Sequence, residues 1–292
     1  MIGTCRLCGQ QEKLKESHFI PKFVGKWLKK TSITGYFREH NELEKRAQDT
    51  AKEYWLCGQC EGLLSNWERE FANKIFYPFA DQGHSTASYG PWFAKFCASL
   101  SWRTLTLIRH KNPDRDKPVE YYEQLDAAQD HLRRFILGKT ENLEQYEQHV
   151  FHLQEIESTD SNELPTGINR YFLRGMAMDI VGNSTDLYIY TKIPSFIILG
   201  VVKAKQLNKL RASRIALKEG KLIPRSYRWP DGFHSYVFEK AEEMILAHRQ
   251  IPEKDLKKFE DFIAEHPEKA ANSKQFKALM HDYQRFGAKI FR

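Results

Sequence analysis

The chain has 292 residues, of which 41% are hydrophobic and 13% aromatic, a composition that excludes a disordered polypeptide and suffices for one large or two ordinary domains. The formal charge of +7 favours polyanionic partners such as nucleic acid. Nothing at the N-terminus resembles a signal peptide, and the longest apolar stretches, such as residues 196–202, are too short to cross a bilayer. We therefore expect a soluble, cytoplasmic protein without a membrane partner.

Four of the five cysteines form two pairs with two-residue spacing, Cys5 with Cys8 and Cys57 with Cys60. In a reducing compartment such pairs indicate metal binding rather than disulfides. Each pair can form a tight knuckle, and two knuckles complete a closed tetrahedral site of the kind that holds structural zinc. A redox motif is the alternative, although it needs no second copy. The fifth cysteine, Cys97, lies in an apolar helical pattern and is expected in the core.

The first third of the chain alternates between charged and apolar stretches. Residues 20–28 predict a strand or short helix, and the strongly charged residues 38–53 predict a surface loop. A helix is predicted after the second knuckle, because apolar residues recur every four positions until Pro78 stops the pattern. These apolar residues are Leu63, Trp67, Phe71 and Ile75. The polar, Gly- and Ser-containing residues 81–91 predict a linker between two units, residues 1–82 and 91–292.

The second unit is predicted to be an α+β region with helices and an antiparallel sheet. Helices are predicted for residues 92–109, 119–137 and 141–154, and strands for residues 171–181, 187–192 and 196–202. From about residue 235 the chain returns to amphipathic helices. We expect this unit to set specificity or to bind a protein partner, although it contains no motif that we can assign.

A histidine motif and an acidic residue accompany the knuckles in a fixed order. Glu16-Ser17-His18 lies between the knuckles and is followed by Pro21, while Glu61 comes directly after Cys60. Together with the paired cysteines, this order resembles the HNH endonuclease family over residues 1–82. The resemblance implies a treble-clef-like ββα-metal fold, in which structural zinc pins a β-hairpin to a helix.

The resemblance also implies roles for the polar residues. His18 takes the place of the general base that deprotonates water, and Glu61 takes the place of a residue that helps to bind a catalytic Mg²⁺ or Mn²⁺. Ser17 stands where the family usually has a metal-binding Asp, Glu or His, so that Glu16 or a water would have to fill this place. The family's intermediate Asn has no clear equivalent, because Lys52 and Glu53 occupy its neighbourhood.

Helical spacing adds one more candidate ligand for the divalent ion. Glu61, Ser65 and Glu68 share one helical face, so Glu68 could bind the same ion as Glu61. The alternative for both acids is an ordinary solvated helix face. For His18 the alternative is a packed histidine that is bonded to the backbone.

Basic residues near these motifs are candidates for phosphate contacts, which position a nucleic acid without reading its sequence. In the first unit they are Lys22, Lys26, Lys29, Lys30, Arg46 and Lys52, with Phe23 and Trp27 interleaved. A second basic cluster contains no acidic residue and comprises Lys203, Lys205, Lys209, Arg211 and Arg214. It is interpreted first as a solvated face. Arg170, Arg174 and Asp179 are interpreted as structural ion pairing.

The sequence thus predicts a metal-dependent nuclease that acts on DNA rather than RNA, in restriction or in defence against phage. Two alternatives stay open. One is a zinc-stabilised module that binds nucleic acid or protein after loss of its catalytic site, in agreement with Ser17 and the missing Asn. The other is an RNase or toxin, in which Trp27, Phe37 or Trp55 stacks on single-stranded bases.

Overall fold

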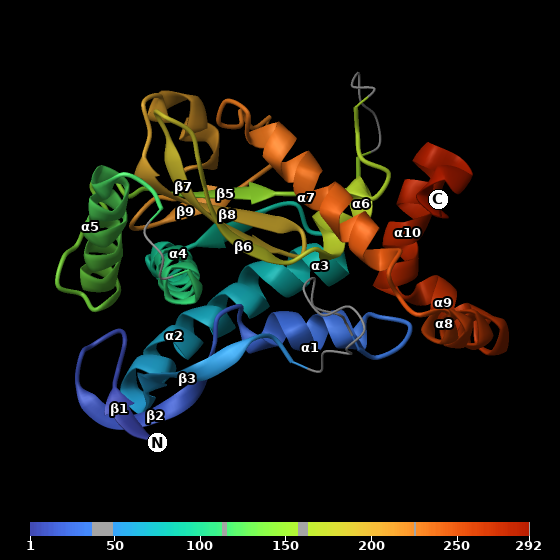
Figure 1. Ribbon diagram of the computed structural model, residues 1–292, viewed down its shortest axis with the longest axis horizontal. Coiled ribbons are helices and arrows are strands. Elements are labelled where there is room, and N and C mark those ends of the chain that lie inside the picture. The colour runs from blue at the N-terminus through green and yellow to red at the C-terminus, as the bar shows by residue number, and fades with distance from the viewer. Residues whose placement is uncertain (37–48, 113–115, 157–162, 225, 292) are drawn as a thin grey trace.

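The computed structural model describes residues 1–36, 49–112, 116–156, 163–224 and 226–291 (Figure 1). Phe37, Arg46 and most of the predicted charged loop lie outside these ranges. The described chain has an α+β fold with three antiparallel sheets. None of its helices is both long enough and apolar enough to cross a membrane.

The first sheet carries both cysteine knuckles. Its strands β1 (Ile2–Thr4), β2 (Gln11–His18) and β3 (Lys52–Cys57) lie in the order β1-β2-β3. The first knuckle forms the connection from β1 to β2, where Gly9 has a φ of +82° that a residue with a side chain rarely adopts. The second knuckle spans the end of β3 and the first turn of α2 (Gly58–Phe71). The register places Leu14 opposite Cys57, which brings the two knuckles to the same end of the sheet.

Helix α1 (Lys22–Lys30) follows β2 directly, so the helical alternative for residues 20–28 is confirmed. Val24, Trp27 and Leu28 are buried and recur at the spacing of one helical face. Lys29 and Lys30 lie in the last turn, where positive charge complements the helix dipole.

The predicted helix after the second knuckle is present and continues beyond Pro78. Helix α2 runs through a π-helical segment (Ala72–Phe76) into α3 (Tyr77–Gln82). The prediction that Pro78 stops the helix is therefore wrong. Pro78 lies at the start of α3, directly after the π-helical segment, and the helix continues past it. Gly83, in the left-handed conformation with a φ of +72°, ends the helix instead.

The stretch predicted as a linker is only partly a loop. Residues 87–89 form β4 (Ala87–Tyr89), which pairs with β9 (Gly220–Leu222) in a two-stranded sheet. Aromatic side chains from both sides of the stretch also pack together, because the Phe71 ring stacks on Phe96 at 4.2 Å between centroids and meets the edge of Phe196 at 5.6 Å. The two units thus share one hydrophobic core. Independent folding of each unit stays a prediction.

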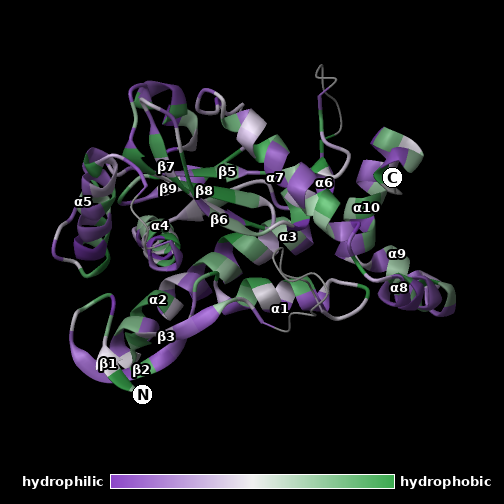
Figure 2. Cartoon of the chain, in the orientation of Figure 1, coloured by the Kyte–Doolittle hydropathy of each residue, from purple (hydrophilic) through white to green (hydrophobic). Residues whose placement is uncertain are grey.

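The largest sheet lies beyond this stretch and has four antiparallel strands in the order β5-β8-β7-β6. They are β5 (Gln148–His152), β6 (Ala177–Gly182), β7 (Leu187–Ile193) and β8 (Phe196–Lys203). Helix α4 (Trp92–Lys111) contacts all four strands, and α5 (Val119–Ile136) packs against α4. Helix α7 (Phe233–His248) contributes Phe233 and Val237 to a second core on the opposite face. Figure 2 shows hydrophobic residues concentrated in this central sheet and hydrophilic residues along α5, β2 and β3.

Two predictions for this region are wrong. The helix predicted for residues 141–154 is absent: residues 141–147 form turns and loop, and residues 148–152 form a strand, because Val150 and Phe151 pair with β8 between two buried layers. The predicted strand from residue 171 begins only at Ala177. Before it, Tyr171 and Phe172 belong to helix α6 (Ile168–Arg174), whose buried side chains follow helical spacing.

The last part of the chain is helical, as the sequence predicts. After a 3₁₀ segment (Leu207–Ser213) and α7, the chain forms α8 (Glu253–Glu265), α9 (Pro267–Asn272), α10 (Lys274–Phe286) and a final 3₁₀ turn (Gly287–Phe291). Ser273 caps α10 by accepting a hydrogen bond from the Phe276 amide at 3.1 Å. Gln275 of α10 binds the segment that follows α1, because its side chain accepts from the Ile33 amide at 2.9 Å. The C-terminal helices therefore contact the first unit.

Candidate functional site

The four paired cysteines meet where the two knuckles lie side by side. Their sulfur atoms all lie within 4.8 Å of one another, and Cys8 Sγ is 3.9 Å from Cys57 Sγ. Four sulfur atoms around one zinc ion, with Zn–S bonds of about 2.3 Å, are separated by about 3.8 Å. The cluster is therefore positioned to hold a metal ion, and its geometry is consistent with structural zinc. Cys97 is buried in α4, as predicted.

The backbone around the knuckles favours a thiolate at Cys5. Burial alone raises the pKa of Cys5, but hydrogen bonds from the backbone of Cys8, Cys57 and Leu7 outweigh burial and lower the pKa to about 7. The Cys57 amide donates one of these bonds to Cys5 Sγ at 3.3 Å. Burial raises the pKa of Cys8 and of Cys60. A bound cation is thus needed to hold all four cysteines as thiolates, the form that ligates metals.

His18 lies at the end of β2 and is held by an acidic partner that the sequence analysis did not identify. Its Nε2 is 2.9 Å from Asp49 Oδ2, and its side chain is 11% exposed. Burial disfavours the Asp49 carboxylate, but the hydrogen bond and the charge of His18 outweigh this effect and lower the pKa of Asp49. The Thr50 amide fixes the second oxygen, Oδ1, at 3.0 Å. One feature of the sequence could have indicated Asp49 as a partner of His18. It is an acidic residue in the segment before the second knuckle, where the resemblance to HNH endonucleases leads one to expect an Asn.

Helix α2 carries both candidate acids, and Glu68 lies close enough to His18 to interact with its charge. Glu61 lies in the first turn, and Glu68 lies two turns later. Burial raises the pKa of Glu68, although the Arg103 guanidinium opposes this shift. The charge of Glu61 raises the pKa of Glu68 further, and the charge of His18 lowers it. Glu68 Oε1 accepts a hydrogen bond from Arg103 Nη1 at 2.7 Å, so one of its oxygens is already engaged.

These acids do not form a preassembled metal cage. Over the described part of the chain, the four cysteines are the one group of three or more His, Cys, Asp or Glu residues whose ligand atoms converge on a common point. A divalent ion beside His18 would therefore take one or two protein ligands and complete its coordination with water and substrate phosphate, as Mg²⁺ commonly does.

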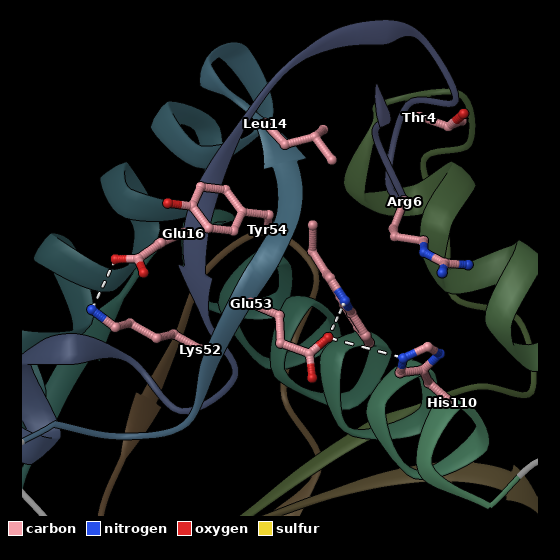
Figure 3. Close-up of a pocket in the computed structure, with 9 residues that line it drawn as sticks. Thr4, Arg6, Leu14, Glu16, Lys52, Glu53, Tyr54 and His110 are labelled. Carbon is pink, nitrogen blue, oxygen red and sulfur yellow. Dashed lines mark hydrogen bonds and ion pairs between the residues drawn. The ribbon is translucent and has the colours of Figure 1, made fainter. Parts of the chain in front are cut away.

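Ser17 and Glu16 point to other partners. Ser17 is buried, and its hydroxyl donates to the Lys15 carbonyl at 3.3 Å. Glu16 Oε2 binds Lys52 Nζ at 2.8 Å, as Figure 3 shows. Lys52 Nζ also lies 3.8 Å from Asp49 Oδ2, so two carboxylates balance its charge.

An open cleft of about 720 Å³ lies along the sheet beside these residues (Figure 3). Glu53 Oε2 accepts from Trp55 Nε1 at 2.8 Å and lies 4.0 Å from Nε2 of His110, which comes from α4. Trp55 packs edge-on against Phe19 at 4.6 Å between centroids. Trp27 and Trp55 are each only 5% exposed, so neither ring offers a stacking surface for bases.

The basic residues differ in whether they form ion pairs with acidic residues of the described chain. On α1, Lys22, Lys26 and Lys30 are exposed and form no ion pair within the described chain, whereas Lys29 is half-buried. In the second cluster Lys209 pairs with Asp231 and Arg214 with Glu147. The remaining members of that cluster are Lys203, Lys205 and Arg211.

The predicted ion pairing around Arg170 is present, but its partner differs. Arg170 binds Asp282 of α10 at 2.9 Å. Arg174 instead donates to Thr31 Oγ1 and to the Leu28 carbonyl at the end of α1. The Arg174 contacts join the second unit to the first, whereas the Arg170 pair lies within the second unit, and neither leaves a separate site.

The His18 ring is thus bonded to Asp49, and the His18 carbonyl accepts from a buried arginine of α4 that also binds Glu68 of α2. Comparisons of the chain with descriptions of known protein families, with curated proteins and with solved structures found no match. The chemistry of these side chains is therefore the basis on which a function can be assigned.

Proposed function

We propose that the protein is a metal-dependent nuclease whose residues 1–82 form an HNH-like unit, with His18 as the general base. The observation that carries this proposal is the 2.9 Å contact between His18 Nε2 and Asp49 Oδ2, beside a helix that begins in a cysteine knuckle. With Nε2–H donating to Asp49, Nδ1 is the nitrogen that can accept a proton from water. No hydrogen bond within the described chain occupies Nδ1. His18 can therefore deprotonate a water molecule that attacks a phosphodiester.

We further propose that the cysteine cluster holds structural zinc and that Glu61 helps to bind a catalytic Mg²⁺ or Mn²⁺. Such an ion, when bound, would stabilise the negative charge that develops on the phosphate oxygens. Asp49 keeps the His18 ring oriented through the bond to Nε2. Glu61 lies on the first turn of α2, so the knuckle that holds the zinc also places this carboxylate.

DNA is the proposed substrate, with restriction or defence against phage as the proposed setting. Helix α1 begins four residues after His18, and its Lys22, Lys26 and Lys30 are exposed without acidic partners in the described chain. A phosphate backbone that lies along α1 would thus lead to His18. Phosphate contacts of this kind do not distinguish DNA from RNA, so a ribonuclease stays the alternative within this class.

A binding module without catalysis is the second candidate, and one observation favours it. Ser17, at a position where a metal ligand is expected, is buried and bonded to the Lys15 carbonyl. If Glu61 alone cannot retain a divalent ion, the same surface would bind nucleic acid without cleaving it.

Replacing Glu61 tests the proposed catalytic ion. We expect Glu61→Ala to lower the rate of DNA cleavage about 10²-fold, with partial recovery at high Mn²⁺, because the ion loses a protein ligand. Glu70→Ala is the matched control, since Glu70 lies nine residues further on and hence on the opposite face of α2. The ion assignment is wrong if Glu61→Ala cleaves as fast as wild type at every Mn²⁺ concentration.

Replacing a lysine of α1 tests the proposed path of the nucleic acid. We expect Lys26→Ala to weaken DNA binding and to reduce the slope of log affinity against log salt by about 0.9, the effect of one lost phosphate contact. Lys52→Ala should change this slope less, because Glu16 and Asp49 already balance the Lys52 charge. Fluorescence anisotropy at several salt concentrations measures both variants. An unchanged slope for Lys26→Ala would exclude α1 from the interface.

A further inference from the structure

Arg103 connects the second unit to the backbone of His18. It lies in α4, beyond the stretch that separates the two units, and its side chain is 4% exposed. Its Nη1 donates to the His18 carbonyl oxygen at 2.9 Å and to Glu68 Oε1 at 2.7 Å. Its Nε donates to the Ser99 carbonyl one turn back on α4, at 3.4 Å. One guanidinium therefore ties together the end of β2, helix α2 and helix α4.

A buried arginine at this place is costly for stability. Transferring a guanidinium and a carboxylate out of water costs several kcal/mol per ion. A pair of apolar residues of similar size often stabilises a protein as much as such an ion pair, or more. The pair is also incompletely satisfied, because Arg103 Nη2 is buried without a hydrogen-bond partner in the described chain. Packing alone thus gives no reason for an arginine here, whereas the bond to His18 gives one.

The His18 carbonyl group has Arg103 as its hydrogen-bond donor. The next residue, Phe19, still pairs with the Ala51 carbonyl through its amide at 3.1 Å, but the His18 carbonyl accepts from the arginine instead. On the same face of α4, seven residues after Arg103, His110 approaches Glu53 of β3 (Figure 3). Helix α4 therefore lies along this sheet over two turns and fixes the direction of the Arg103 side chain.

We propose that Arg103 is a positioning residue that the second unit supplies to the first, and that it holds the His18 ring against Asp49 by anchoring the His18 backbone and Glu68. Its effect on cleavage rests on the proposed nuclease function, whereas its effect on the His18 ring does not. The residues beyond position 91 then complete the site around His18, in addition to any role in specificity.

The test removes both members of the buried pair, since Arg103→Met alone would leave Glu68 buried and unpaired and could prevent folding. We compare the wild-type full chain with Glu68→Gln/Arg103→Met, with the conservative variant Arg103→Lys, and with the control Arg109→Met, whose arginine binds Asp126 and Gln129 of α5 instead. Circular dichroism and elemental analysis establish folding and metal content. ¹⁵N NMR of the histidine rings then reports the tautomer of His18 and its hydrogen bond to Asp49.

We expect the double variant to fold and to retain its metal, but to lose the NMR signature of the Nε2–H tautomer bonded to Asp49. Arg103→Lys should keep part of that signature, and Arg109→Met all of it. Cleavage by the double variant should fall about 10²-fold in kcat with little change in KM, because a displaced base slows the chemical step. An unchanged His18 signature in the folded double variant, or in Arg103→Lys if the double variant does not fold, overturns the proposal. If wild type cleaves nothing but the signature still shifts, Arg103 positions His18 and the nuclease proposal fails.

Discussion

Removing the metal from the cysteine cluster is expected to unfold the N-terminal sheet and the first turns of α2. The two knuckles connect β1 to β2 and β3 to α2, and an ion held by all four cysteines would join them directly. Structural zinc sites contribute about 10–16 kcal/mol in zinc-finger peptides, which is as large as the whole stability of a typical domain. The far end of α2 should stay folded, because Phe71 is packed against Phe96 and Phe196.

Hydrogen exchange before and after addition of a chelator measures this effect, together with elemental analysis for one zinc per chain. Protection should be lost in residues 1–18 and 52–60 and kept in β7 and β8. Cys57→Ser should purify without zinc, while Cys97→Ala, which removes a buried thiol outside the cluster, should retain it. Wild-type protein that contains no zinc and keeps full protection in chelator would contradict a structural metal.

His18→Ala is expected to abolish most nucleic-acid cleavage while zinc content and folding stay intact. General-base catalysis contributes about 10²- to 10⁴-fold in rate, and in the described chain no other histidine is bonded to Asp49. The four cysteines already fill a tetrahedron, so His18 is not needed as a zinc ligand. Loss of the ring also returns the pKa of Asp49 toward its usual value, since the hydrogen bond and charge of His18 lower it.

The control for this variant is His84→Ala, which removes an exposed histidine just after α3. Cleavage rates should be compared at equal zinc content, so that a structural defect is not mistaken for a catalytic one. His18→Ala protein that cleaves as fast as wild type would remove His18 from the mechanism.

The features predicted correctly from the sequence are those with local signals. The cysteine knuckles are visible in four residues each, and α2, α4 and α5 follow apolar spacing within one segment. Residues 148–152 were assigned to a helix because their strand conformation depends on pairing with β8, about fifty residues later. Helix α6 was missed for the related reason that its buried face is short and the β-like stretch follows at once.

Residues of the site were likewise predicted where the signal is local and missed where it depends on distant parts of the chain. His18 and Glu61 lie beside the knuckles and could be chosen from the motif. Asp49 and Arg103 could not be assigned to His18, because they lie 31 and 85 residues away from it along the chain. Arg103 in particular lies in the buried part of α4, where its sequence context gives no sign of a partner in the first unit.

Cleavage by the wild-type full chain is the most direct test of the nuclease proposal. Zinc-loaded protein is incubated with supercoiled plasmid DNA and, separately, with RNA, in the presence of Mg²⁺, Mn²⁺ or EDTA. We predict nicked and linear DNA with Mg²⁺ or Mn²⁺, and none with EDTA under conditions in which the structural zinc is retained. Intact DNA and RNA under every metal condition would contradict the proposal and leave a zinc-stabilised binding module as the function of this surface.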